Sequence, residues 1–358
     1  MRFQFLCLLG LLLLPCLAEA SSSTVAGERT IEFVSQSGER VAALQGSFEV
    51  PLDWARPGGP RIGLSYVRFP ATGDGEGAPI VYLAGGPGGS GIDTARGPRF
   101  PLFMAMREFG DVIAFDQRGT GASSPQPTCR STVVIYDARR YSDAEALALD
   151  REAALQCLAQ WREAGLDLRA WTTAQSVGDL DGLRRHLGAE KLSLWGISYG
   201  SHLALAAIAR MDAHLDRVVL ASVEGLDQTV KRPAETDAYF ARLQAAINTR
   251  PELAAQFPDV VGLIRRVHAR LEAQPLELDI APPGQPAYRY VLERRDMQDF
   301  ASAMIADPPN ALRLLMLYAA IDAGIHAPVA AVIAQFHRPG EPIRYNPMPF
   351  AMDLASGI

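Results

Sequence analysis

The chain has 358 residues, a hydrophobic fraction of 48%, a charged fraction of 21% and a formal net charge of −6. These values are typical of a globular protein, and the weak acidity without any run of lysine or arginine argues against a nucleic-acid partner. The length suits one large α/β domain with an insertion, or two domains.

The N-terminus predicts a secretory signal peptide. Arg2 precedes an apolar run, Phe5 to Leu14, that is too short to cross a bilayer as a helix. Ala18-Glu19-Ala20 places small residues at the two positions that signal peptidase recognises. We therefore expect removal of residues 1–20 and a secreted or periplasmic protein without membrane attachment. A lipoprotein anchored through Cys16 is disfavoured because Pro15 precedes it.

Short apolar runs predict the strands of a sheet. Two runs separated by turn residues predict a hairpin, and four nearly continuous runs are typical of parallel strands buried on both faces. In chain order the six segments are Ala43–Leu52, Ile62–Phe69, Pro79–Ala84, Asp111–Phe115, Lys191–Trp195 and Asp216–Ser222. With helices predicted at Ser176–Gly188 and Tyr199–Met211, this alternation implies an α/β fold with a mostly parallel sheet and right-handed crossovers.

The pattern changes after Asp227. Helical segments surround a predicted β-hairpin at Leu276–Met297, whose turn contains Pro282-Pro283-Gly284, and a further helix is predicted at Pro309–Gly324. We therefore expect a core at residues 21–227 and a mostly helical lid or cap insertion at residues 228–358.

Residues Gly196 to Gly200 match G-x-S-x-G and lie between a predicted strand and a predicted helix. In that context the pattern is typical of a sharp turn that raises a serine above the end of a sheet. The two glycines let the strand and the helix approach closely, and the helix N-terminus directs its dipole at the serine. The sequence thus predicts Ser198 as a catalytic nucleophile.

The segment Ala84 to Gly91, AGGPGGSG, contains G-x-G-x-x-G, which also occurs in dinucleotide-binding loops. Such a loop opens directly into a helix, whereas Gly97-Pro98 interrupts this one soon afterwards. We favour a loop of backbone N–H groups that stabilises the oxyanion of acyl transfer. The expected donors are Gly85, Gly86 and Tyr199, the residue after the serine.

A third motif, FDQRGTGASSP, spans Phe115–Pro125. Asp116 and Arg118 in this glycine-rich loop are expected to form an ion pair that shapes the floor of the site. Together the three motifs, in this order, resemble the proline iminopeptidase and tripeptidyl aminopeptidase branch of the α/β-hydrolases. The resemblance covers roughly Ala43 to Asp227.

This resemblance implies an α/β-hydrolase fold with a helical lid. It also implies a serine peptidase that removes residues from the N-terminus of short peptides through Ser198. Related proteins carry a histidine where this chain has Ala84. Tripeptidyl-type members often lack that histidine, which favours their branch.

A catalytic serine in this fold is followed first by an acid and then by a histidine. His202, one helical turn beyond Ser198, is expected to be structural. His337 is a candidate base, with Asp322 as acid, if Val329–Phe336 is a strand, but the alanines there favour a helix. Of the other histidines, His186 and His214 lie in surface-like helix and loop contexts, His268 is flanked by arginines in a lid helix, and His326 follows Asp322 at i+4. We therefore expect the last strands, the acid and the base of such a hydrolase to be absent from this chain.

Two cysteines remain after removal of the signal peptide, Cys129 and Cys157. In an exported protein such a pair predicts one disulfide, with two free thiols as the alternative. Zinc is disfavoured because neither cysteine has a C-x-x-C or nearby histidine partner. Nothing in the sequence supports a metal or an organic cofactor.

An aminopeptidase also needs a carboxylate for the ammonium group of its substrate. Glu224, just after the strand that ends at Ser222, and Glu235 in the lid are the candidates. Three functions stay open: an exported exopeptidase on short peptides, an esterase on small acyl esters, and a non-catalytic binding protein or pseudoenzyme.

Overall fold

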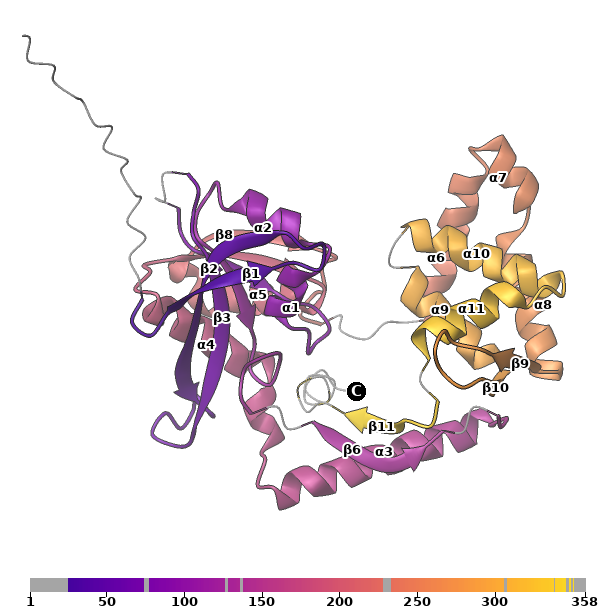
Figure 1. The fold of residues 1–358 in the computed structure, drawn as a ribbon, viewed down its shortest axis with the longest axis horizontal. Helices are drawn as coiled ribbons and strands as arrows, with labels where there is room; N and C mark the ends of the chain where they lie inside the picture. Colours follow the sequence, from indigo (N-terminus) through magenta and orange to yellow (C-terminus); the bar gives the residue numbers. More distant parts are fainter. Residues whose placement is uncertain are drawn as a thin grey trace, which may run out of the picture.

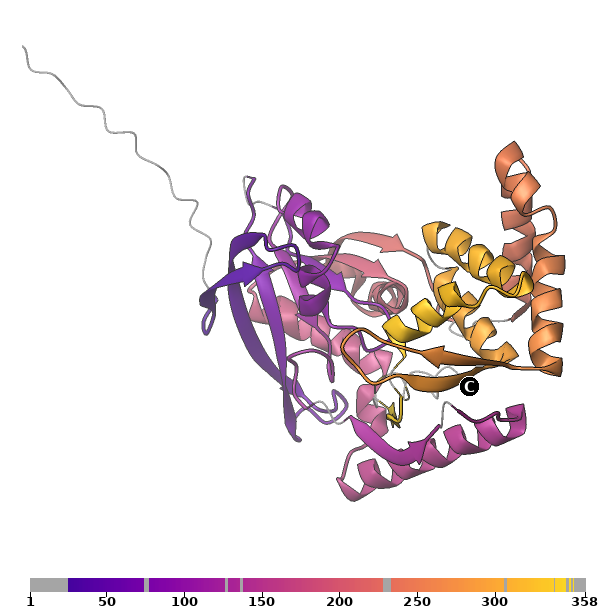
Figure 2. The same cartoon turned by 45° about the vertical axis from the view of Figure 1, so that its right-hand side comes forward.

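The computed structural model describes residues 25–73, 77–125, 128–135, 138–227, 233–305, 308–337, 339–345, 348 and 350. The predicted signal peptide at residues 1–20 lies outside these residues. Figure 1 shows a body built around a sheet and a second, mostly helical body, with helix α3 running beneath both; the turned view in Figure 2 shows the same arrangement.

The sheet body contains seven strands in the order β1-β2-β3-β5-β4-β7-β8. Strands β5, β4, β7 and β8 are parallel neighbours, whereas β1, β2 and β3 are joined by antiparallel pairs, as are β3 and β5. The bounds are β1 Arg29–Val34, β2 Arg40–Pro51, β3 Arg61–Phe69, β4 Ile80–Leu83, β5 Val112–Asp116, β7 Leu192–Ile197 and β8 Leu215–Ala221. The predicted α/β sheet and its N-terminal hairpin are confirmed, and β1 was not predicted.

Helices cover both faces of this sheet. All residues of β4 and β5 are buried, as expected for strands covered on two sides. Successive side chains of a strand point to opposite faces: Ile113 packs with residues of α4 and α5, whereas Val112 packs with residues of α1 and α2. These helices span α1 Gly91–Arg96, α2 Phe100–Met106, α4 Thr173–His186 and α5 Tyr199–Met211.

An insertion between β5 and α4, here called the β6–α3 insertion, was not predicted. It consists of β6 (Cys129–Val134) and the long helix α3 (Asp143–Glu163), whose first turn is fixed by a capping box of Ser142 and Glu145. Cys129 and Cys157 form a disulfide between the two elements, which confirms the predicted pairing. Strand β11 (Pro342–Tyr345) returns to pair antiparallel with β6.

The helical body has a hydrophobic core of its own, which includes Phe257, Leu315 and Tyr318. Its elements are α6 Pro233–Ile247, α7 Pro251–Gln256, α8 Val260–Ala273, β9 Leu276–Ile280, β10 Tyr288–Leu292, α9 Arg294–Met304, α10 Pro308–Asp322 and α11 Ala327–Phe336. The β9–β10 hairpin and helix α10 confirm two predictions. The alternative of a strand at Val329–Phe336 is wrong, because this segment belongs to α11, as its alanines indicate.

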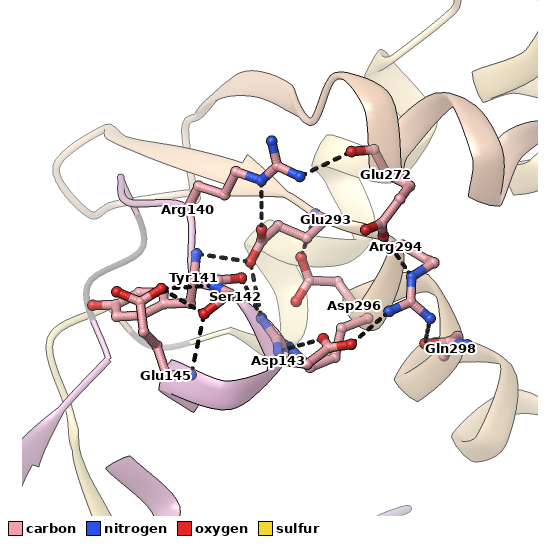
Figure 3. A network of polar contacts seen from close by, with 11 residues as sticks. Arg140, Tyr141, Ser142, Asp143, Glu145, Glu272, Glu293, Arg294, Asp296 and Gln298 are labelled. Atoms are coloured by element: carbon pink, nitrogen blue, oxygen red, sulfur yellow. Dashed lines mark hydrogen bonds and ion pairs between the residues drawn. The ribbon is translucent and has the colours of Figure 1, made fainter. Parts of the chain in front are cut away.

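A network of charged side chains joins the start of α3 to the helical body (Figure 3). Asp143 at the beginning of α3 accepts hydrogen bonds from Arg294 and Arg295 at the beginning of α9, at 2.8 and 2.9 Å. Arg295 also donates to the backbone carbonyl of Tyr141. Acidic groups favour a helix N-terminus, so Asp143 both supports its own helix and neutralises the two arginines of the other.

No helix in the described parts of the chain combines the length and the apolar character that crossing a membrane requires.

Candidate active site

Ser198 lies on a sharp bend between β7 and α5. Its backbone has φ of 54° and ψ of −126°, a region that costs a non-glycine residue about 1–3 kcal/mol. A Cβ atom on Gly196 would lie 2.4 Å from the carbonyl oxygen of Gly200, and one on Gly200 would lie 2.0 Å from that of Leu83. Only glycine therefore fits at positions 196 and 200, and the predicted tight turn is present. Ser198 on this turn is half-buried.

The glycine-rich loop after β4 lies directly beside Ser198. A Cβ atom on Gly85 would be 2.9 Å from the Cβ and 3.4 Å from the Oγ of Ser198. Tyr199 occupies the first position of α5, where backbone N–H groups point away from the carbonyls of their own helix. Two of the three residues predicted as oxyanion donors, Gly85 and Tyr199, therefore lie beside the Ser198 hydroxyl, and the role of all three stays a prediction.

Asp116 ties the two glycine-rich loops together. Its Oδ1 accepts hydrogen bonds from the Ser90 hydroxyl at 2.7 Å and the Ile92 amide at 3.0 Å, both at the start of α1. Its Oδ2 accepts the Ala122 amide at 2.7 Å. Burial raises the pKa of Asp116, and these hydrogen bonds oppose that rise. Asp116 thus fixes the end of the AGGPGGSG loop.

The expected ion pair between Asp116 and Arg118 is wrong. Arg118 is fully buried and binds Asp179 of α4 through two nitrogen–oxygen pairs at 2.6 Å. It also donates to the backbone carbonyls of Leu52 and Ala170. A planar guanidinium is best satisfied by a carboxylate that offers both oxygens. The oxygens of Asp116 already accept hydrogen bonds from the Ser90 hydroxyl and from the amides of Ile92 and Ala122.

Glu224 is the acidic side chain next to the serine. The Ser198 hydroxyl donates to Glu224 Oε1 at 3.0 Å. The loop that carries Glu224 follows β8 and is fastened to α5, because the Glu224 amide donates to Ser201 Oγ at 2.8 Å. Glu235 lies instead on the exposed first turn of α6, in the helical body shown in Figure 1.

Three of the described histidines contact groups other than the Ser198 hydroxyl. His202 Nδ1 lies 3.1 Å from the carbonyl oxygen of Gly225, which agrees with its expected structural role. His337 follows α11 and packs against the rings of Tyr288 and Tyr290. His268 bonds to the Tyr318 hydroxyl at 2.8 Å.

One expectation about the histidines is wrong. His186 does not lie in a surface-like position: it stacks on Phe48 and hydrogen-bonds to Tyr66. Asp322 binds Arg266 of α8, so the pairing of Asp322 with His337 as acid and base has no support.

Sequence reasoning missed the residues that hold the site together. Ser201 was not singled out, although a serine in the first turn after the bend can bond to neighbouring backbone groups. Asp179 was also missed; a carboxylate beside Leu180 on the apolar side of a predicted helix signals a buried cationic partner. Within the described residues, no three His, Cys, Asp or Glu side chains are grouped to hold a metal ion.

Comparisons with known proteins agree with this geometry. The family described as "alpha/beta hydrolase fold" matches residues 78–308. The serine protease Hip1 of Mycobacterium tuberculosis is 34% identical over 173 residues, which cover 46% of this chain and 32% of that protein. The tripeptidyl aminopeptidase of Streptomyces coelicolor is 31% identical over 194 residues, with coverages of 50% and 34%.

A third relative, carboxylesterase B of Mycobacterium tuberculosis, is 31% identical over 259 residues, which cover 67% of this chain and 48% of that protein. The chain thus spans between 32% and 48% of the length of these three curated relatives. The family match extends from just before β4 to α10 and includes the bend at Ser198. The chain therefore belongs to the α/β-hydrolase fold family.

Proposed function

We propose that this protein is an exported serine peptidase that forms an acyl-enzyme on Ser198. Its substrates are short peptides, from which it releases N-terminal residues or tripeptides. The observation that carries the proposal is the position of Ser198, half-buried on a bend with positive φ, beside a loop of glycines. A nucleophile whose backbone is fixed before the substrate binds loses less entropy in reaching the reactive geometry.

The glycine-rich loop supports acyl transfer. In the proposed reaction the backbone N–H groups of Gly85, Gly86 and Tyr199 bind the negative charge that develops on the attacked carbonyl oxygen. Such donors act most strongly when they are fixed before the reaction, and loss of one costs about 3 kcal/mol in the barrier. Asp116 provides that fixation at the far end of the loop, through Ser90 and Ile92.

Peptidase activity and export rest on separate observations. The names of two relatives, serine protease Hip1 and tripeptidyl aminopeptidase, support a peptide substrate. The disulfide between Cys129 and Cys157 supports an oxidising compartment, in keeping with the secreted or periplasmic location expected from residues 1–20.

An esterase is the second candidate. The relative named carboxylesterase B matches a longer part of this chain than the two peptidases do. Ester and amide substrates use the same nucleophile and oxyanion donors, so the site geometry alone favours neither substrate.

Two measurements test the proposal. A fluorophosphonate probe should label the folded protein, and the Ser198→Ala variant should not be labelled. A folded protein that is not labelled would instead support a non-catalytic binding protein. Release of a chromophore from aminoacyl and tripeptidyl anilides, compared with simple acyl esters, then separates a peptidase from an esterase.

A further inference from the structure

The carbonyl oxygen of Ala84 is held by a buried side chain. Gln117, which follows Asp116 at the end of β5, donates from Nε2 to this oxygen at 3.1 Å. The Ala84 carbonyl and the Gly85 N–H belong to one peptide unit, whose bond is not cis. In a planar trans peptide the C=O and N–H bonds point in opposite directions. The Gln117 amide therefore fixes the direction of the Gly85 N–H, one of the expected oxyanion donors.

The peptide unit of the Tyr199 N–H is held in the same way. Its carbonyl belongs to Ser198, and Ser201 Oγ donates to that oxygen at 2.6 Å. The backbone amide of Ser201 donates to the same oxygen at 2.7 Å. Because this carbonyl faces the first turn of α5, the Tyr199 N–H points away from the helix.

We propose that Gln117 and Ser201 are positioning residues for the two oxyanion donors of this protein. Each side chain binds a carbonyl oxygen and thereby orients the N–H group on the opposite side of the same peptide. Both act through the backbone and not on the substrate. This inference rests on the proposed function, because it requires the N–H groups of Gly85 and Tyr199 to bind the developing negative charge.

The two hydrogen bonds also strengthen the donors. Hydrogen bonds in a chain polarise one another, by about 10–30% per bond, so an N–H donates more strongly when the carbonyl of its own peptide is an acceptor. Donors that are fixed beforehand need no reorganisation as charge develops. Gln117 and Ser201 therefore supply both direction and polarisation to two backbone groups that carry no net charge.

The burial of Gln117 indicates that packing alone does not account for a glutamine here. Its side chain is 1% exposed, and within the described residues its Oε1 has no hydrogen-bond partner. An unpaired buried acceptor disfavours the folded state, so an apolar side chain of the same size would fit this place with less cost. The contact that the glutamine provides is the bond from its Nε2 to Ala84.

Two neighbouring side chains fix the first glycine-rich loop at both ends. Gln117 holds the start of the loop through Ala84, whereas Asp116 holds its far end through Ser90 and Ile92. Both follow from the buried strand β5. The loop that contains the expected donor is therefore fastened to the rigid centre of the sheet.

Ser201 makes a second contact that a test must separate from the first. It is fully buried, and its Oγ also accepts the amide of Glu224 at 2.8 Å. Ser131 offers a matched control, because it is likewise buried, donates to the carbonyl of Ile343 at 2.9 Å and accepts the amide of Val133 at 3.2 Å.

The first test is single-turnover acylation of the full chain by p-nitrophenyl acetate. Gln117→Met keeps the length of the side chain and removes the amide donor. The acylation rate should fall by between about 10- and 10²-fold, less than the about 10²–10³-fold cost of losing a whole donor. The half-saturating ester concentration should not change, because the oxyanion forms only in the transition state. Gln244→Met removes a bond of the same length to Phe257 in the helical body and should leave the rate unchanged.

The second test compares substitutions of Ser201. Ser201→Ala should slow acylation by a similar factor. Ser201→Thr keeps a hydroxyl that can bond to the carbonyl three residues earlier in a helix, so it should retain more activity than the alanine variant. Ser131→Ala should react at the wild-type rate. Circular dichroism of each variant verifies that the fold is retained.

NMR gives a readout that needs no reaction. The ¹⁵N signal of an amide moves downfield when the carbonyl of its own peptide accepts a hydrogen bond, because the peptide is polarised. Labelling with carbonyl-¹³C serine and ¹⁵N tyrosine selects only Ser65-Tyr66 and Ser198-Tyr199, and alanine with glycine selects four pairs that include Ala84-Gly85. Gln117→Met should move only the Ala84-Gly85 signal of these upfield, and Ser201→Ala only that of Ser198-Tyr199.

The outcomes distinguish the two proposals. The positioning role is wrong for a residue whose folded variant acylates within twofold of the wild type, or whose amide signal keeps its position. If Gln117→Met does not fold, Gln117→Glu replaces it, because an ionised carboxylate has the same shape and no donor. If folded wild-type protein is not acylated, or Ser198→Ala reacts at the wild-type rate, the proposed function is wrong, and the amide signals alone then decide the positioning role.

Discussion

The guanidinium of Arg118 and the carboxylate of Asp179 face each other in the protein interior, joined by two nitrogen–oxygen pairs at 2.6 Å. The indole N–H of Trp54 donates to the same carboxylate at 2.9 Å. These contacts connect the loop after β5, helix α4 and the segment after β2. The pair therefore fixes three elements around the end of the sheet that carries Ser198.

We expect Asp179→Asn to destabilise the fold by about 3–5 kcal/mol, because it leaves a buried guanidinium without its counter-charge. Urea unfolding monitored by circular dichroism measures this loss. Glu49→Gln is the control: Glu49 pairs with Arg61 at 3.3 Å on the exposed surface, where loss of a partner costs less than about 1 kcal/mol. Equal losses in both variants would contradict the structural role given to the buried pair.

Gly85→Ala should reduce fluorophosphonate labelling of Ser198 by at least about tenfold, a loss of the size expected when a reacting group is misplaced by about 1 Å. The added Cβ would lie 2.9 Å from Ser198 Cβ and 3.0 Å from the carbonyl oxygen of Ile197, so one of them must move. Gly58→Ala provides the comparison, because no atom lies within 4 Å of the Cβ it would add. Unchanged labelling of Gly85→Ala would place the loop outside the reacting site.

Removal of the disulfide should weaken the β6–α3 insertion. The bond closes a loop with a sequence separation of 28, for which chain entropy predicts a stabilisation of about 3–4 kcal/mol. We expect the Cys129→Ser/Cys157→Ser variant to unfold at a lower urea concentration than the oxidised wild type. Dithiothreitol should lower the wild-type midpoint to a similar value and leave that of the variant unchanged.

Asp296 in the network of Figure 3 makes stability depend on pH. Burial raises its pKa to about 6, against the opposing effect of its hydrogen bonds from the Glu293 amide and Tyr290. The protonated form of Asp296 is therefore favoured more in the folded state than in the unfolded state, where the pKa of an aspartate is about 3.9. The stabilisation of the folded state by protonation of Asp296 is complete below about pH 4 and is lost as the pH rises to about 6.

We therefore expect Asp296→Asn to be more stable than the wild type at pH 7, by at most about 3 kcal/mol, with little difference at pH 4. Thermal unfolding across this pH range measures the effect. Asp279→Asn, an exposed acid on β9, should show no such divergence. A variant that gains no stability above pH 6 would show that Asp296 is not protonated preferentially in the folded state.

The sequence predicted those elements of the fold whose signals lie within a few neighbouring residues. The buried strands, the hairpin of β2 and β3 and the bend at Ser198 each follow from residues close together in the chain. Gly196 and Gly200 signalled the bend because their lack of side chains is a condition for it. The loop of Gly85 could be associated with Ser198 only through the order of strands in the sheet.

Contacts between distant segments could not be predicted in the same way. Arg118 and Asp179 are 61 positions apart, and the sequence offered Asp116 as a nearer partner. Helix α3 buries only Ala153, Cys157 and Trp161 among its 21 residues, so its apolar pattern is weak. The contact of Ser198 with Glu224 depends on a positive φ at Ser222, which the identity of a serine does not signal.

The pairing of β6 with β11 has a consequence for biosynthesis. Arg130 pairs with Arg344, a separation of 344 − 130 = 214 residues. At about 5–20 residues per second, the ribosome makes the second partner about 10–40 s after the first. Cys157 emerges far earlier, so the bond to Cys129 can join β6 to α3 before the partner strand exists. Strand β11 therefore pairs with a β6 strand that the disulfide already holds against α3.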